Sequence, residues 1–144
     1  MQQSTPLVRA AAAYGRAEHQ SPARQVALLC ARAIRYLGEA RAATEERRIE
    51  ARFAAVTQAH TIVGGLRACL DFTHGGEIAP LLDRLYAYLL GRLTQINLRD
   101  DPAICDEAIG LLTRMRDGWA EIASRCPDRA PGTGQADLPP LLSA

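Results

Sequence analysis

Histidine and cysteine are the residues of this chain whose chemistry could extend beyond packing. The histidines are His19, His60 and His74, and four cysteines stand at positions 30, 69, 105 and 126. The histidines lack the spacing of zinc ligands, and no CxxC pair occurs. Three of the four cysteines fall in Ala/Leu-rich stretches, where cysteine packs as a small hydrophobic residue. We therefore expect buried free thiols, no metal site and no cofactor.

Other motifs give no sign of catalysis. His74-Gly75-Gly76 is similar to the oxyanion loop of esterases, but the chain has no GxSxG sequence to supply a nucleophile. The acidic residues are scattered over predicted solvent-facing positions beside arginines, so no inward carboxylate pair suggests acid–base chemistry. We expect His74-Gly75-Gly76 to be a turn and the protein not to be an enzyme.

One histidine supports a sharper hypothesis. The stretch from Ala59 to Gly64, AHTIVG, resembles the phosphorylatable motif of histidine phosphotransfer domains, which are also four-helix bundles. A phosphohistidine relay needs an exposed imidazole, a nearby cation and small residues that let a partner approach. Gly64 and Gly65 meet the last need, but Val63 stands where that family has lysine.

The helical phase of His60 argues against a solvent-exposed imidazole. His60 shares its phase with Ile49, Phe53 and Val56, which predicts a buried or half-buried imidazole. Phosphotransfer through His60 therefore remains the alternative function.

Composition limits the class of protein. The 144 residues and 15.6 kDa suit one domain, and 48% hydrophobic residues are enough to build a core. All 17 basic residues are arginine, yet the net charge is only +1, so we expect neither nucleic acid nor an anionic membrane as partner. No apolar run approaches the roughly 18 residues of a membrane span. Residues 1–13 do not resemble a signal peptide, which predicts a cytoplasmic protein.

Apolar periodicity predicts an all-α antiparallel four-helix bundle over residues 21–126. The expected helices cover about 21–43, 45–70, 77–98 and 102–125. Ser21-Pro22 and Asp101-Pro102 are helix-start signals, and Pro127 stops the last helix. Residues 1–20 are expected to form a flexible arm bearing Tyr14, and the Pro-rich residues 127–144 a disordered tail.

Each predicted helix carries an apolar stripe. For the second helix the stripe comprises Ile49, Phe53, Val56, Val63 and Leu66. Gly64-Gly65 interrupts this helix, and close approach to another helix is the simplest explanation.

The stretch from Tyr14 to Ala123 resembles the flagellar secretion chaperone family FliS. The matching segments follow one another in order at the family's spacing. They are Ala13-Tyr14, Ser21-Pro22, Ala33-Ile34-Arg35-Tyr36-Leu37, Leu70-Asp71, Thr73-His74-Gly75-Gly76-Glu77-Ile78-Ala79, Leu85-Tyr86-Ala87-Tyr88-Leu89, Arg92-Leu93, Ile96-Asn97 and Arg116-Asp117-Gly118-Trp119. Where the family usually has Leu-Tyr-Asp-Gly, this sequence reads Leu29-Cys30-Ala31-Arg32, which removes an aromatic and an acid that could touch cargo.

The resemblance implies a non-enzymatic chaperone in the cytoplasm. Such a protein holds the disordered C-terminal segment of flagellin, prevents its polymerisation and assists export, with the export apparatus as a further partner. The family's N-terminal arm is thought to cover part of the binding surface until cargo displaces it. Tyr14 is the expected anchor of that arm. A helical adaptor that has diverged to bind some other partner is a third hypothesis.

Outward-facing apolar residues predict the cargo contacts. By helical phase, Leu28 points outward among arginines, Leu90 points outward beside Tyr86, and Ile109 does so on the last helix. We expect this set to bind flagellin, and a charge placed at Leu28 or Leu90 to abolish binding while helicity is kept.

Overall fold

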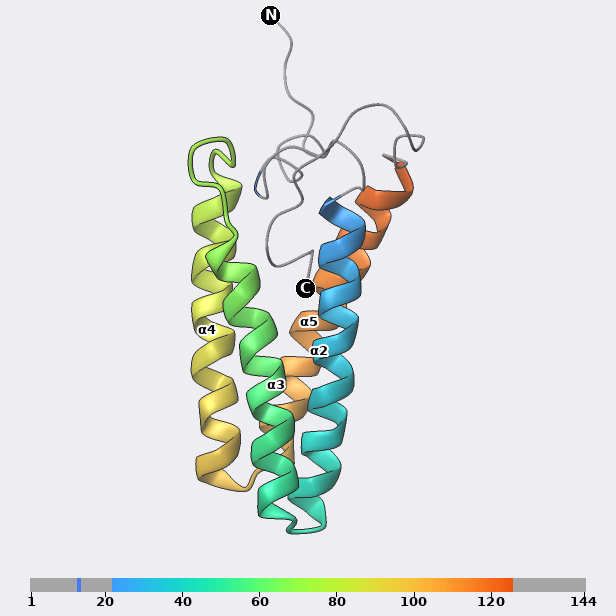
Figure 1. The fold of residues 1–144 in the computed structure, drawn as a ribbon, viewed down its shortest axis with the longest axis vertical. Coiled ribbons are helices and arrows are strands. Elements are labelled where there is room, and N and C mark those ends of the chain that lie inside the picture. The colour runs from blue at the N-terminus through green and yellow to red at the C-terminus, as the bar shows by residue number, and fades with distance from the viewer. Residues whose placement is uncertain (1–12, 14–21, 126–144) are drawn as a thin grey trace, which may run out of the picture.

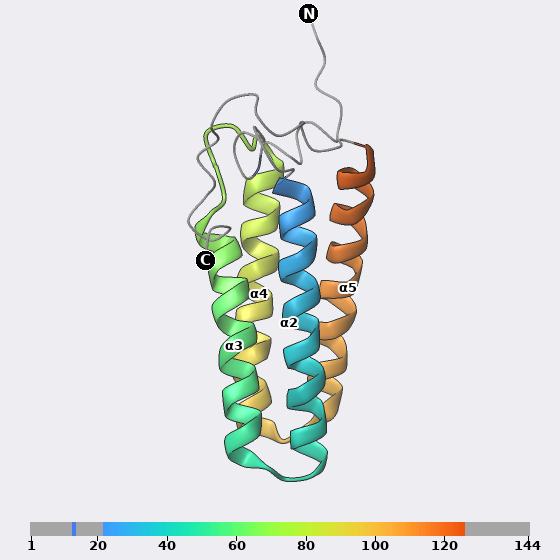
Figure 2. The ribbon, with the colours of Figure 1, turned by 45° about the vertical axis from the view of Figure 1, so that its right-hand side comes forward.

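The computed structural model describes Ala13 and residues 22–125, and within them it contains four long helices and no strand. The helices are α2 (Pro22–Glu45), α3 (Ile49–Ala68), α4 (Ile78–Arg99) and α5 (Pro102–Arg125). They run alongside one another, and each reverses the direction of the one before it (Figures 1 and 2). The predicted all-α four-helix bundle is confirmed, and the helix ends lie within about two residues of the predicted ones except at the start of α3, which begins four residues later than predicted.

Local chemistry explains where the helices begin and end. Asp101 accepts a hydrogen bond from the backbone N–H of Ala103 through Oδ1, at 2.9 Å, and Pro102 is the first helical residue of α5. Asp100 ends α4 in the left-handed conformation, with φ at +50°. In the α3–α4 connection Gly76 has φ at +54°, a value that glycine adopts without a steric penalty.

The bundle is built around α2. This helix has its most extensive contacts with α5 and α3, whereas α4 packs mainly on α3 and only slightly on α5. The buried face of α2 is rich in alanine, at Ala23, Ala27, Ala33 and Ala40, so neighbouring helices can approach it closely. Larger side chains from all four helices fill the rest of the core. The largest fully buried ones are Tyr86, Leu37, Leu66, Leu89, Leu93, Ile96 and Leu112.

The predicted core face of α3 is partly wrong. The buried residues of α3 are Arg52, Ala55, Val56, Ala59, Ile62, Val63 and Leu66. Ile49 and Phe53 are instead 65% and 61% exposed, and His60 is exposed. The three do share a phase, as predicted, but that face is turned about 100° from the core because the smaller alanines set the helix rotation.

The explanation predicted for the glycine pair is also wrong at Gly64. A β-carbon built on Gly64 would meet nothing within 4 Å, so this residue is not required for contact with another helix of the bundle. Gly75 shows the opposite case. A β-carbon there would lie 2.5 Å from the carbonyl oxygen of Asp71 and 3.1 Å from Cα of Ala13, so only glycine fits.

The predicted arm and tail lie almost entirely outside the described residues, as do Tyr14, His19 and Cys126. Ala13 is the exception: it is fully buried, and its carbonyl oxygen accepts a hydrogen bond of 2.7 Å from the N–H of Asp71. Across the described residues, none of the helices combines the length and apolarity that a bilayer crossing requires.

Candidate partner-binding surface

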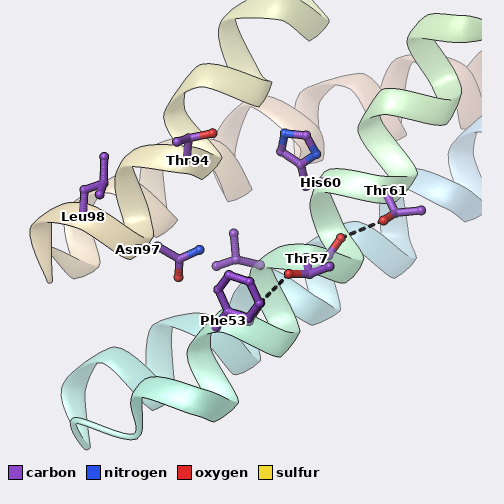
Figure 3. A pocket seen from close by; sticks show the side chains of 8 residues that line it. Phe53, Thr57, His60, Thr61, Thr94, Asn97 and Leu98 are labelled. Carbon is purple, nitrogen blue, oxygen red and sulfur yellow. Dashed lines mark hydrogen bonds between the residues drawn. The ribbon is translucent and has the colours of Figure 1, made fainter.

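A groove lies between α3 and α4 (Figure 3). Its volume is about 320 Å³. The lining residues are Phe53, Val56, Thr57, His60 and Thr61 from α3, and Thr94, Asn97 and Leu98 from α4. We call this hollow the α3/α4 groove.

The apolar character of the groove comes from large side chains that the bundle leaves uncovered. Phe53 is 61% exposed and Leu98 is 71% exposed. Ile49, one helical turn from Phe53 on α3, is also exposed and extends the apolar surface toward the end of the bundle. Such a cluster is the kind of surface that marks a site of contact with another molecule.

The hydroxyl groups in the groove are already used inside the helices. Thr57 donates to the carbonyl of Phe53 at 2.8 Å, Thr61 to that of Thr57 at 2.9 Å, and Thr94 to that of Leu90 at 3.1 Å. The threonines therefore make little demand for a polar partner. Asn97 differs, because its Oδ1 is buried and accepts no hydrogen bond from the described residues.

No charged residue lines the groove, but an ion pair lies beyond each end. Toward the α3–α4 connection, Nε of Arg67 lies 2.7 Å from Oδ1 of Asp83. This hydrogen bond raises the pKa of Arg67 and lowers the pKa of Asp83. At the other end the buried Arg52 pairs with Asp100 and donates to the carbonyl of Asn97 at 3.2 Å.

The lining residues of α3, from Phe53 to Thr61, extend about 12 Å along the helix axis at 1.5 Å per residue. About two turns of a guest helix would lie over this length. The geometry therefore favours an uncharged, apolar helical face as the ligand.

Comparisons with known proteins place the chain in a family. A family model described as flagellar protein FliS matches residues 8–126. The chain belongs to the FliS family. It is 38% identical over 103 residues to the flagellar secretion chaperone FliSB of Pseudomonas aeruginosa, covering 72% of this chain and 82% of that protein.

Other FliS relatives extend over a similar part of the chain. The flagellar secretion chaperone FliS of Salmonella typhimurium is 37% identical over 106 residues, covering 73% of this chain and 78% of the relative. The protein of the same name from Vibrio cholerae is 33% identical over 102 residues, covering 71% and 75%. The family resemblance found in the sequence is confirmed.

The structure does not bring the sequence-predicted contact residues of this FliS protein together. Leu28 is 64% exposed on α2, as predicted. Leu90 and Ile109 are only half-exposed and pack against the core, so their predicted outward orientation is wrong. Tyr86 is fully buried, because it lies on the same inward face of α4 as Leu89 and Leu93.

The groove includes residues that sequence reasoning missed. The sequence pattern predicts Phe53 in the core stripe and does not single out Leu98 as a contact. Spacing alone gives no signal, because positions 52, 55, 59, 62 and 66 and the stripe through Ile49 and Phe53 fit helical periodicity equally well. The buried face contains Arg52 and two alanines, so it is less apolar in sequence than the predicted stripe with Ile49 and Phe53.

The remaining chemically capable residues serve the fold. Burial raises the pKa of the Cys30 thiol to about 12 and that of Cys105 to about 11, so both thiols stay protonated and unreactive. His74 lies in the predicted turn, with Nδ1 2.8 Å from Oδ2 of Asp71. Among the described residues no group of three or more His, Cys, Asp or Glu is placed to hold a metal ion.

Proposed function

We propose that this FliS-family protein is a cytoplasmic, non-enzymatic chaperone that binds the C-terminal segment of flagellin and keeps it from polymerising before export. The observation that carries the proposal is the α3/α4 groove, which is uncharged and is flanked by exposed Phe53 and Leu98. The relatives are named flagellar secretion chaperones, which supports an export substrate as the ligand. The export apparatus would be the second partner.

Binding of this kind couples folding to association. A disordered segment would form an amphipathic helix and place its apolar face on the preformed groove. Full burial of an exposed Phe or Leu stabilises the bound state by about 1.5–3 kcal/mol. Several such contacts are needed, because ordering the segment costs about 2–5 kcal/mol or more. Ile49, Phe53 and Leu98 together offer contacts of that size.

The proposed arm also has a docking point. Tyr14, the expected anchor, lies outside the described residues, but the adjacent Ala13 is held by its hydrogen bond to Asp71 and by the space above Gly75. This position beside the α3–α4 connection supports an arm that covers part of the bundle surface until flagellin displaces it.

Other predicted contacts take different roles in this proposal. Leu90 lies one helical turn before Thr94, a lining residue, but does not itself line the groove and packs against the core. Ile109 and Tyr86 contribute through the packing behind the surface, because they are half-buried and buried respectively. A charge at Leu90 would therefore disturb the core as well as any flagellin contact, which makes Phe53 and Leu98 the better test positions.

Titration of the purified full-length protein with a peptide covering the flagellin C-terminal segment tests the proposal. We expect a one-to-one complex with a gain of helix in circular dichroism. The double variant Phe53→Glu, Leu98→Glu should bind at least 10-fold more weakly. Leu81→Glu is the matched control, because Leu81 is an exposed leucine of α4 that does not line the groove. Absence of binding by the wild-type protein would favour an adaptor for another partner.

Phosphotransfer through His60 is the alternative, and one observation bears on it directly. His60 is exposed, contrary to the sequence prediction, so the imidazole is accessible. However, none of the residues that line its groove carries a positive charge that could steady a phosphoryl group. Transfer of phosphate to the wild-type protein but not to His60→Gln would establish the alternative.

A further inference from the structure

We infer that the outer face of α2 is a second docking surface, which binds an acidic helical segment of a partner protein through Leu28, Arg32 and Arg35. This surface differs from the proposed flagellin site in both position and charge. The α3/α4 groove lies between α3 and α4, whereas α2 packs on α3 and α5. The two surfaces can therefore be tested independently.

The residues form one stripe along the helix. Leu28 is among the large apolar side chains most exposed on the described surface, at 64%. Arg32 lies one turn after it and Arg35 two turns after it, and both are exposed. The stripe from Leu28 to Arg35 extends about 10 Å along the axis, enough to contact two turns of a partner helix.

The stripe is positive in a chain that is otherwise close to neutral. No Asp or Glu occurs between positions 19 and 38, although the whole chain contains 16 acidic residues; Glu39, one turn after Arg35 on the same face, marks the end of the positive stripe. Most other helical arginines have a carboxylate partner, as in the pairs Arg41–Asp106 and Arg92–Glu107. Within residues 22–125 no acidic side chain lies within 4 Å of Arg32 or Arg35.

Arg35 also contacts an aromatic ring. Its guanidinium carbon lies 5.2 Å from the centre of the Tyr36 ring, in cation–π contact. A guanidinium held this way keeps its donors available and loses less side-chain entropy when a carboxylate binds. Arg32 and Arg35, three residues apart, also repel one another, and that repulsion is relieved when a carboxylate lies between them.

Charge and shape together select the partner. An apolar side chain beside two guanidinium groups is complementary to a helix that carries acidic residues around one apolar residue. A nucleic acid backbone offers no apolar group for Leu28, and so few arginines would release few counterions. A second copy of this chain is a poor fit, because acids such as Asp83, Asp106 and Glu107 are engaged by its own arginines.

A synthetic 16-residue amphipathic peptide, with glutamates flanking a leucine stripe, is a suitable probe. Its affinity for the full-length protein would be measured by fluorescence anisotropy at 50 mM salt, beside a counterpart with every Glu changed to Gln. We expect binding of the acidic peptide only. The double variant Arg32→Glu, Arg35→Glu, and separately Leu28→Glu, should each weaken it at least 10-fold.

The control variant is Arg84→Glu, Arg114→Glu, which reverses two exposed arginines on α4 and α5. We expect this variant to bind the acidic peptide within twofold of the wild-type affinity. Equal loss in the control and test variants, or no binding at all, would overturn the inference. Binding of a polynucleotide or of anionic vesicles at the same strength, lost in Arg32→Glu, Arg35→Glu, would also overturn it.

Saturation with the flagellin peptide separates this inference from the proposed function. The acidic probe should bind the saturated protein with unchanged affinity. Competition would show that α2 belongs to the flagellin site and would overturn a second surface. If flagellin does not bind at all, the probe experiment still decides the role of α2.

Discussion

The α3/α4 groove and the outer face of α2 expose apolar side chains in opposite electrostatic settings. Phe53 and Leu98 lie among threonines with no charged neighbour lining the groove, whereas Leu28 lies beside Arg32 and Arg35, which form no ion pair within residues 22–125. The first setting favours ligands for their apolar face alone. The second adds orientation and selectivity through charge. The exposure of an apolar residue therefore does not define a binding site by itself, because the charge of the neighbouring residues determines which ligand can bind.

The largest expected effect is a difference in stability between variants of a buried and an exposed leucine of the same helix. Leu93 is fully buried and Leu98 is mostly exposed, although both are leucines of α4. Leu93→Ala should lower the free energy of unfolding by about 2–5 kcal/mol, because it leaves a cavity. Leu98→Ala should change it by less than about 0.5 kcal/mol, and weaken flagellin binding instead. Urea denaturation measures the first effect and peptide titration the second; similar unfolding energies for the two variants would contradict the assigned burial.

The second largest expected effect is a difference between the two surfaces in how binding affinity depends on salt. Raising the salt concentration from 50 to 500 mM should weaken the acidic probe by about 10-fold or more, because its contacts are ionic. Flagellin binding to the uncharged groove should change by less than about twofold. Isothermal titration at both concentrations provides the measurement. A steep salt dependence for flagellin would assign charge a role that the groove residues do not explain.

Substitution of two glycines by alanine should have a smaller effect on stability, and only one of the two substitutions should change flagellin affinity. Gly64 and Gly110 both lie within helices, and a β-carbon on either meets nothing within 4 Å. Each change to alanine should raise the free energy of unfolding by about 0.5–1 kcal/mol. Gly64→Ala should also weaken flagellin binding a few-fold, because Gly64 lies one turn after the lining residue His60 and a bound helix that extends past the groove would meet the added methyl group. Gly110→Ala should leave that affinity unchanged; equal affinities in the two variants would remove Gly64 from the binding surface.

The smallest expected effect concerns pH at the end of the groove. The hydrogen bond from Arg67 lowers the pKa of Asp83 below its ordinary value. The pair therefore stabilises the fold above the unfolded-state pKa of about 3.9, and this contribution is lost as the pH falls through the lower folded value. Asp83→Asn should lower stability slightly at pH 7 and flatten the decline below about pH 4. Thermal melts between pH 2.5 and 7 would show this, and parallel pH curves for both proteins would exclude it.

Much of the fold could be predicted because its signals are local. The capped start at Asp101-Pro102 and the glycine turn before α4 are properties of a few neighbouring residues, and both are confirmed. The rotation of α3 could not be predicted in the same way. It depends on which side chains the other helices accommodate, and close packing against alanine-rich α2 favours Ala55 and Ala59 over Phe53.

The candidate site was harder to predict for the same reason. A groove depends on the space between two helices, so neither α3 nor α4 reveals it alone. The outward orientation of Leu28 is predicted correctly because arginines surround it along a single helix, whereas Tyr86 is predicted as a contact but is buried, because an aromatic residue fits both a core and an interface.

Methyl nuclear magnetic resonance during titration with the flagellin C-terminal peptide tests the central claim most directly. Val56 and Leu98 report on the groove, and Leu28 reports on α2. We predict that the methyl signals of Val56 and Leu98 shift on binding while those of Leu28 stay in place. Shifts confined to Leu28, with the groove signals unchanged, would contradict the assignment of the groove as the flagellin site.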